Sequence, residues 1–190
     1  MSVCLVDRRI SPLMNPHEAP PPIKATMLTV EEAIPDTCVP LLAACHSRMP
    51  HVQRGPWVVC FVAHYEFTAY GVALWNNPSA RTLPQSWLEL RRMAVAPDAP
   101  HCTASFMLGA MRRHIKTYYG ERYDRLISYQ DQDVHTGTIY KAAGWSPEWV
   151  TKARVRDRSK PRVGTSRAYR SNANGAAPDA SAKTRWEIPL

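Results

Sequence analysis

The chain has 190 residues, of which 45% are apolar, and it carries a formal net charge of +8. A chain of this length and composition can bury one substantial core, so we expect a single domain with tails. The longest uncharged apolar stretch, residues 57–63, is far too short to cross a bilayer, which argues against a transmembrane helix and a membrane partner.

The cysteines and the first residues indicate a compartment. The five cysteines are an odd number without a CxxC spacing, which favours reduced thiols over a disulfide framework or a zinc site. Residues 1–10 already include Asp7, Arg8 and Arg9 and are followed by no apolar signal region. We therefore expect a cytoplasmic protein.

Residues 1–75 predict an arm, a strand, a helical region and a pair of strands. Residues 1–23 are proline-rich and predict an irregular arm, and a single domain is expected over residues 24–190. Residues 24–30 predict a first strand. Residues 31–49 predict a helical region interrupted by Pro35 and Pro40, with inner residues Leu41, Leu42, Cys45 and Met49. Residues 57–65 and 67–75 predict an antiparallel hairpin.

The middle of the chain predicts a strand, a loop and a helix. Residues 87–95 are apolar and β-branched and end in a turn at residues 96–98. From Thr103 the apolar residues follow helical spacing, and Gly120 is the expected stop. A loop that leads into a helix presents unpaired N–H groups and the positive end of the helix dipole, which together bind anions. Thr103 or Ser105 is expected to cap this end.

The last third predicts further elements and a basic segment. Residues 125–129 predict a strand, residues 135–143 a helix ended by Gly144, and residues 186–188 a final strand after a polar linker at 171–183. The basic segment, residues 151–170, contains eight basic residues and one acidic residue, so its net charge is +7. Such a segment favours a polyanion such as DNA, although a solvated tail is the alternative. The residues expected to contact phosphates are Arg154, Arg156, Arg158, Lys160 and Arg162.

Three sequence motifs indicate a family. ELRRMAVAPDAP, TASFMLG and SYQDQDVHTGTIYKAAGW resemble the Mom family of phage DNA-modification proteins, in which we expect an (E/N)L.R strand, a Ser-bearing helix start, SYAD and HTG.(I/V)Y.A..W. The resemblance covers residues 26–149. It implies an α/β, GNAT-like acyltransferase fold, with a central mixed, mostly antiparallel sheet flanked by helices, in the cytoplasm of a phage host.

The resemblance also implies roles for individual residues. Tyr140 would give a proton to a leaving thiolate or orient an acyl oxygen, and Asp131 would accept the hydrogen of the exocyclic amine of a base or act as the base that deprotonates it. The alternatives are core packing for Tyr140 and capping of a turn for Asp131. Because Arg91 and Arg92 are adjacent in a strand, they are expected to point to opposite faces, and the motif favours Arg92 as the binder of a phosphate or carboxylate.

The donor and metal sites are expected from fewer residues. Thr103, Ala104 and Ser105 would bind an acyl-CoA or another acyl donor at the helix start. The loop before them, residues 98–104, lacks the glycines of the (Q/R)xxGx(G/A) loop of standard acetyltransferases. His46 matches a family histidine and, with Cys45, His51 or His135, is a candidate ligand for iron or zinc, although scattered histidines are more often not ligands.

These observations predict an enzyme. The primary hypothesis is a transferase that extrudes adenine from DNA and adds a small acyl-derived, carbamoylmethyl-type group to N6, protecting phage DNA from restriction. A second hypothesis is a GNAT N-acetyltransferase that acts on a protein, a polyamine or a small amine. A third is a non-catalytic DNA-binding protein on the same fold.

Overall fold

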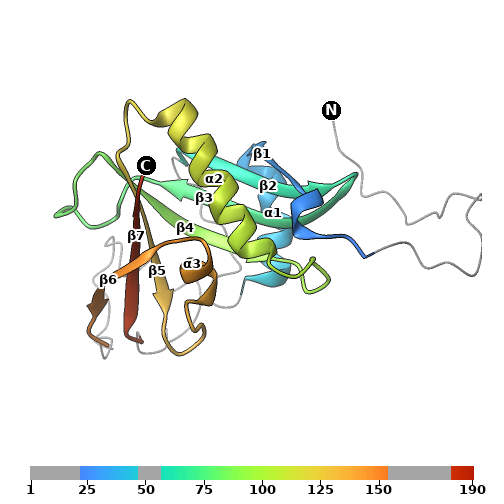
Figure 1. Cartoon of the computed structure of the whole chain (residues 1–190). Helices are drawn as coiled ribbons and strands as arrows, with labels where there is room; N and C mark the ends of the chain where they lie inside the picture. The colour runs from blue at the N-terminus through green and yellow to red at the C-terminus, as the bar shows by residue number, and fades with distance from the viewer. Residues whose placement is uncertain (1–21, 47–56, 154–180) are drawn as a thin grey trace, which may run out of the picture.

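The structure is a computed structural model that describes residues 22–46, 57–153 and 181–190 (Figure 1). A short 3₁₀ helix, Ala25–Met27, comes first. The three α-helices are α1 (Pro35–Cys45), α2 (Thr103–Tyr119) and α3 (Thr138–Ala142). The strands are β1 (Thr29–Ala33), β2 (Val59–Tyr65), β3 (Thr68–Asn76), β4 (Trp87–Val95), β5 (Arg125–Asp131), β6 (Ser146–Thr151) and β7 (Lys183–Pro189).

The strands form one sheet in the order β1-β2-β3-β4-β5-β7-β6. The β4–β5 pair is parallel, and every other neighbouring pair is antiparallel. The prediction of a mixed, mostly antiparallel sheet is therefore confirmed. The parallel pair is possible because α2 connects β4 to β5 and carries the chain back to the starting end of the sheet.

Helices cover the two faces of the sheet unequally. Helix α2 lies across one face with α3 beside it, and α1 lies on the other face against β2, β3 and β4 (Figure 1). On the α2 face the core includes Phe61, Trp75, Leu88 and Met107. On the α1 face the smaller core includes Cys38, Leu42, Val72 and Leu74. The even-spaced alternation of apolar residues along β2 and β3 supplies both cores at once.

An irregularity in β4 changes which side chains face α2. Leu90 pairs with Trp75, but Arg92 pairs with Leu74, so Arg91 is an extra residue in β4. A bulge of this kind breaks the alternation of side chains along a strand. Leu88 and Leu90 face α2 before the bulge, and Met93 and Val95 do so after it.

Strands β4 and β5 pair only over their first halves. The pairing runs from Trp87 with Arg125 to Leu90 with Ser128, and beyond that point β4 pairs only with β3 and β5 only with β7. Figure 1 shows the two strands close together at one end and separated at the other. The strands therefore part directly after Ser128 and at the bulge of β4.

The N-terminal elements differ from the prediction. Residues 24–28 form the 3₁₀ turn, and the first strand begins at Thr29, so Glu31 and Glu32 lie in β1 rather than in a helix. An edge strand tolerates such charges because both side chains reach polar partners at the surface. Glu32 accepts hydrogen bonds from His114 (2.7 Å) and Tyr119 (3.0 Å) of α2.

The first helix is continuous, although we expected its prolines to interrupt it. Pro35 is the first residue of α1, where a missing N–H is tolerated, and Pro40 lies within the helix. Cys38 and Leu42 are fully buried in α1, while Leu41 and Cys45 are partly buried. Met49 lies outside the described residues.

The other elements follow the prediction with shifted ends. Strand β4 has the predicted bounds, α2 ends before Gly120, and β5 continues two residues further to Asp131. Helix α3 is shorter than residues 135–143, because the left-handed Gly137 precedes it, and Gly144, with φ +78°, ends the turn that follows. Among the described helices none is long and apolar enough to cross a membrane.

Candidate functional site

A pair of buried hydroxyls lies where β4 and β5 part. Tyr140 projects from α3 and Ser128 from β5, and their oxygens lie 2.8 Å apart. Tyr140 is 8% exposed and Ser128 is 2% exposed. Ser128 is the last residue of β5 that pairs with β4, so the backbone fixes its position. The pair therefore holds a phenol hydroxyl in one place at the point of separation.

Two indole rings surround the phenol ring. The ring of Trp186, on β7, stacks on Tyr140 with centroids 5.3 Å apart and an interplanar angle of 13°. The ring of Trp145 meets Tyr140 edge to face at 5.7 Å. Such contacts add to the energy of burial and leave the phenol ring little rotational freedom. We call Tyr140, Ser128, Trp145 and Trp186, with Gln130, the hydroxyl–indole cluster.

Gln130 connects the cluster to the loop before α3. Its side-chain carbonyl accepts a hydrogen bond from Nε1 of Trp186 at 2.7 Å, and its side-chain N–H donates to the carbonyl of His135. Gly137 packs against the same two side chains: a Cβ there would clash with the indole ring of Trp186 and lie 2.7 Å from Oε1 of Gln130. The φ of Gly137 is +77°, so both conformation and space require glycine.

Burial sets the protonation state of Tyr140. Burial raises the pKa of the Tyr140 phenol above its ordinary value, and the hydrogen bond with Ser128 acts in the opposite direction. The phenol is consequently neutral across the physiological range and carries a proton. The arrangement suits a group that donates a proton to a leaving atom.

The start of α2 is not capped as predicted. Thr103 donates its hydroxyl hydrogen to the carbonyl of Pro100 (2.7 Å), and Ser105 donates to the carbonyl of Cys102 (3.1 Å). The N-cap residue is Cys102, and its side chain makes no capping bond. Because neither hydroxyl accepts a bond from a first-turn N–H, the capping prediction is wrong. Helix geometry provides no internal partners for these N–H groups, so they suit an anion.

The loop before α2 takes a glycine-like conformation without glycine. Cys102 has φ +68°, in the left-handed region that glycine usually occupies. Its thiol lies 3.0 Å from Nδ1 of His101, and both side chains are exposed. The missing glycines of residues 98–104 therefore do not prevent the backbone from turning sharply into α2.

Arg92 lies on the α1 face of the sheet. It pairs with Leu74, whose side chain belongs to the α1-side core, and its guanidinium donates to the carbonyl of Arg91 at 2.6 Å. Burial, followed by the charge of Arg91, lowers the pKa of the Arg92 guanidinium, while Glu89 opposes the shift. The predicted alternation, with Arg91 and Arg92 on opposite faces of the strand, does not apply here, because Arg91 is the bulged residue.

Three cationic or ionisable groups approach each other on this side. Burial lowers the pKa of the His46 imidazole, and the charges of Arg92 and His135 lower it further. His46 ends α1, and His135 lies in the loop after β5. The structure therefore brings together the end of α1, the bulge of β4 and the loop before α3.

Asp131 ends β5 at the entrance to that loop. One of its carboxylate oxygens accepts the N–H of Asp133 at 3.1 Å, and its backbone carbonyl accepts the N–H of His135 at 3.0 Å. The turn-capping role is thus present. Its position in the alternation places Asp131 with Tyr129 on the face opposite Ser128 and Gln130.

A metal site is not supported by the described part of the chain. No three His, Cys, Asp or Glu side chains there are grouped closely enough to hold an ion. The positive charge of Arg92 beside His46 also disfavours a cation at that position. His51 lies outside the described residues, as do Arg154, Arg156, Arg158, Lys160 and Arg162.

The sheet divides the predicted site residues between its two faces. Tyr140 lies on the α2 face, while Arg92 and Asp131 lie on the other face, in the parts of β4 and β5 that no longer pair with each other. Sequence reasoning missed Ser128 and Trp186 as contacts of Tyr140, and Gln130 as the hydrogen-bond partner of Trp186. Ser128 and Gln130 lie in the same sequence motif as Asp131. Their spacing of two residues in a predicted strand could have indicated that they share one face of the sheet. Trp186 had no local signal, because it is far away along the chain.

Comparison with known proteins gives one family match and a set of solved structures with a similar fold. The model of the Mom protein family matches residues 67–183, which is more than half of the chain. A comparison with curated protein sequences gives no match.

Solved structures with the same fold are acetyltransferases. A Bacillus subtilis acetyltransferase in complex with CoA has 14% identity and a TM-score of 0.54, and the match covers 86% of this chain and 99% of that one. A GNAT-family acetyltransferase from Streptococcus pneumoniae has 10% identity, a TM-score of 0.56 and coverages of 86% and 99%. Vibrio cholerae spermidine N-acetyltransferase, in complex with CoA and spermine, has 9% identity, a TM-score of 0.56 and coverages of 86% and 96%. The fold is therefore the predicted GNAT fold.

Proposed function

Because this chain belongs to the Mom protein family, we propose that it is a transferase that adds a small acyl group to N6 of adenine in DNA. The modified base would protect the DNA from restriction. One observation carries the proposal: a buried, protonated Tyr140 held by Ser128 at the point where the two parallel strands of a GNAT fold separate.

Tyr140 supplies the proton. The amine attacks the acyl carbon, a new N–C bond forms, and the bond from that carbon to the leaving atom breaks. A leaving anion needs a proton, and the raised pKa of Tyr140 keeps one on its hydroxyl. Ser128 can rotate its own hydroxyl to accept or donate as the phenol changes state.

Asp131 accepts the other proton. The lone pair of adenine N6 is delocalised into the ring, so removal of an N6 hydrogen in the transition state favours attack. Asp131 lies beside the loop that leads to α3, and its carboxylate is held by the N–H of Asp133. Arg92, at the β4 bulge, is suited to pair with a phosphate or carboxylate through two N–H groups.

The proposed donor is an acyl-CoA, bound at the start of α2. The N–H groups of Ala104 and Ser105 belong to the first turn of that helix, and such groups suit a pyrophosphate. Thr103 and Ser105 contribute by holding the turn, since their hydroxyls bond to carbonyls before it. When bound, an acyl-CoA supplies an activated carbonyl and a thiolate leaving group.

The proposed acceptor is DNA because of charge. The basic segment, residues 151–170, begins at the last residue of β6 and has a net charge of +7. A polyamine acceptor would instead require an acidic site. Base extrusion is required because N6 of a paired adenine is engaged within the duplex.

Nucleoside mass spectrometry tests the proposal. DNA from cells that express the protein should contain an adenosine species heavier by a small acyl-type group and should resist restriction enzymes whose sites include that adenine. Cells that express Tyr140→Phe provide the matched control. Modified thymine or cytosine would contradict the adenine assignment. Unmodified DNA with acetylated protein or polyamine would favour a different N-acetyltransferase, and no product at all would favour a non-catalytic DNA-binding protein.

A further inference from the structure

A row of aromatic and basic side chains crosses the sheet on the face opposite α3. In the strand register, Tyr129 of β5 pairs with Arg185 of β7, and Arg185 pairs with Trp149 of β6. Paired residues of antiparallel strands lie on the same face. The alternation also places this row on the face opposite Trp186 and Ser128, so it does not belong to the hydroxyl–indole cluster.

Arg185 holds the row together. Its guanidinium carbon lies 5.6 Å from the ring centroid of Trp149 and 5.6 Å from that of Trp87. Its Nε lies 2.6 Å from the Glu187 carboxylate, which is 5% exposed and also pairs with Arg125 at 2.9 Å. A guanidinium held by a buried carboxylate and in contact with an indole ring restricts the orientation of that ring.

Trp149 is held in this way although much of it faces solvent. Its exposed fraction is 53%, and the next residue, Val150, is 52% exposed. Strand β6 is the edge of the sheet, where natural proteins usually place charged side chains. Helix α1, on the same face, makes its main contacts with β2, β3 and β4 rather than with β6 and β7. Trp149 therefore offers a preoriented aromatic surface to a ligand.

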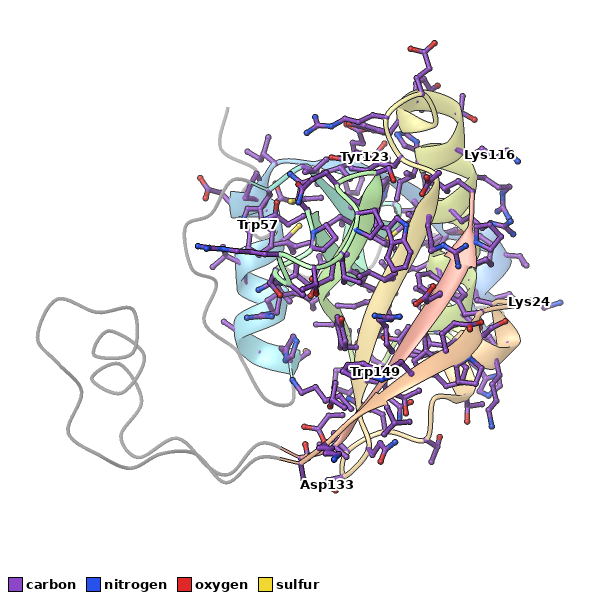
Figure 2. The ribbon with its side chains drawn as sticks, turned by 90° about the vertical axis from the view of Figure 1, so that its left-hand side faces the viewer. Lys24, Trp57, Lys116, Tyr123, Asp133 and Trp149 are labelled. Atoms are coloured by element: carbon purple, nitrogen blue, oxygen red, sulfur yellow. The ribbon has the colours of Figure 1, made fainter. Side chains whose placement is uncertain are left out.

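The row lies beside the proposed site. The next row of the same face contains Asp131, Lys183 and Thr151, paired across β5, β7 and β6. Neighbouring strands are about 4.8 Å apart, so β6 is roughly 10 Å from β5. Figure 2 shows Trp149 toward the end of the sheet at which Asp133 lies, and Tyr123 toward the opposite end. A nucleic-acid strand with one base at Asp131 could consequently place a base only a few nucleotides away on Trp149.

The chemistry of the row fits a nucleic-acid strand. A flat aromatic ring beside guanidinium groups, followed in sequence by the basic segment, offers stacking for a base and positive charge for phosphates. We propose that this face binds DNA that flanks the extruded base, with Trp149 stacking on an unstacked nucleobase. The proposal rests on the proposed function, because it takes DNA as the acceptor.

Stacking and charge contacts differ in their response to salt. Each lost phosphate contact reduces the slope of log affinity against log salt, whereas a lost stacking contact lowers affinity without changing the slope. A Trp149→Ala variant should therefore bind a single-stranded oligonucleotide about tenfold more weakly at every salt concentration. Trp149→Phe keeps a ring and should recover most of the affinity.

The experiment uses the full chain and a single-stranded oligonucleotide that contains 2-aminopurine, whose fluorescence reports stacking. Fully paired duplex provides a second probe, because its bases are already stacked and the loss with Trp149→Ala should be small. The matched control is Phe67→Ala, which removes an aromatic ring that is 98% exposed in the β2–β3 turn. That variant should bind both probes as the wild type does.

Each outcome decides the matter. Weaker single-strand binding with an unchanged salt slope, recovered by Trp149→Phe, supports stacking. Equal binding by Trp149→Ala and the wild type overturns the inference but leaves the proposed function intact if DNA from expressing cells is still modified. A wild type that neither binds nor modifies DNA overturns both. A loss of affinity that Phe67→Ala reproduces also overturns the inference, since it shows only general surface adhesion.

Discussion

The two faces of β5 place similar polar residues in opposite situations. On the α2 face, Ser128 and Gln130 are 2% and 6% exposed, and their side chains bond to Tyr140, Trp186 and the carbonyl of His135. On the other face, Asp131 is only partly buried, and one of its oxygens accepts a bond from the turn that follows.

This difference separates rigidity from adaptability. Buried polar groups with internal partners are costly to rearrange, so the α2 face fixes the Tyr140 proton in one place. Partly exposed groups can exchange their partners for a ligand at low cost. We infer that the α2 face holds the group that must not move, and that the other face holds those that contact a large substrate.

The largest expected effect concerns the rigid face. Gly137→Ala should lower the free energy of unfolding by about 3 kcal/mol, because the new Cβ meets Trp186 and the left-handed φ is unfavourable for alanine. Gly144→Ala is the matched control, with φ +78° but nothing within 4 Å of the new Cβ, and should cost only about 1 kcal/mol. Urea unfolding measures both. Equal losses would show that the cluster is not tightly packed around Gly137.

The next effect concerns the Tyr140 proton. Folding raises the pKa of Tyr140, so the contribution of this group to stability is complete below the ordinary phenol pKa of about 10 and is lost as pH rises through the higher folded value. The wild type should therefore lose stability with rising alkaline pH more steeply than Tyr140→Phe. Parallel curves for the two proteins would mean that the buried phenol ionises as readily in the folded protein as in the unfolded one.

The smallest expected effect concerns the backbone strain at Cys102, directly before α2. Cys102 takes a left-handed φ of +68°, which costs a non-glycine residue roughly 1 kcal/mol. Cys102→Gly should thus raise the unfolding temperature slightly, whereas Cys102→Ala, which removes the thiol but keeps the Cβ, should not. A lower unfolding temperature for the glycine variant would indicate that the thiol contact with His101 stabilises the loop more than the backbone strain destabilises it.

The elements predicted best from the sequence are those in which apolar residues recur at a regular spacing. Strand β4 and helix α2 were located closely, because Leu88 and Leu90 alternate and Met107, Leu108, Met111 and Ile115 follow helical spacing. Helix α1 was misplaced at its start, because Glu31 and Glu32 are as compatible with a first helical turn as with an edge strand. Their partners on α2, His114 and Tyr119, are far away in sequence.

The site was predicted less completely than the fold. Tyr140 and Asp131 were proposed from one sequence motif, but their separation onto two faces follows from alternation along β5 combined with the parting of β4. The position of Arg92 depends on the bulge at Arg91, and no local pattern distinguishes a bulged strand from a regular one. Trp186 comes to Tyr140 only through the pairing of β7 with β5.

One measurement tests most directly whether the two faces act as one site. The yield of modified adenosine would be measured by nucleoside mass spectrometry for Tyr140→Phe, Asp131→Asn and the double variant, each confirmed as folded by urea unfolding. Groups that handle protons in the same step are strongly non-additive, so each single variant should lose about a hundredfold and the double variant little more. Full activity of Asp131→Asn beside an inactive Tyr140→Phe would contradict the account, because it would leave the substrate face without a part in the reaction.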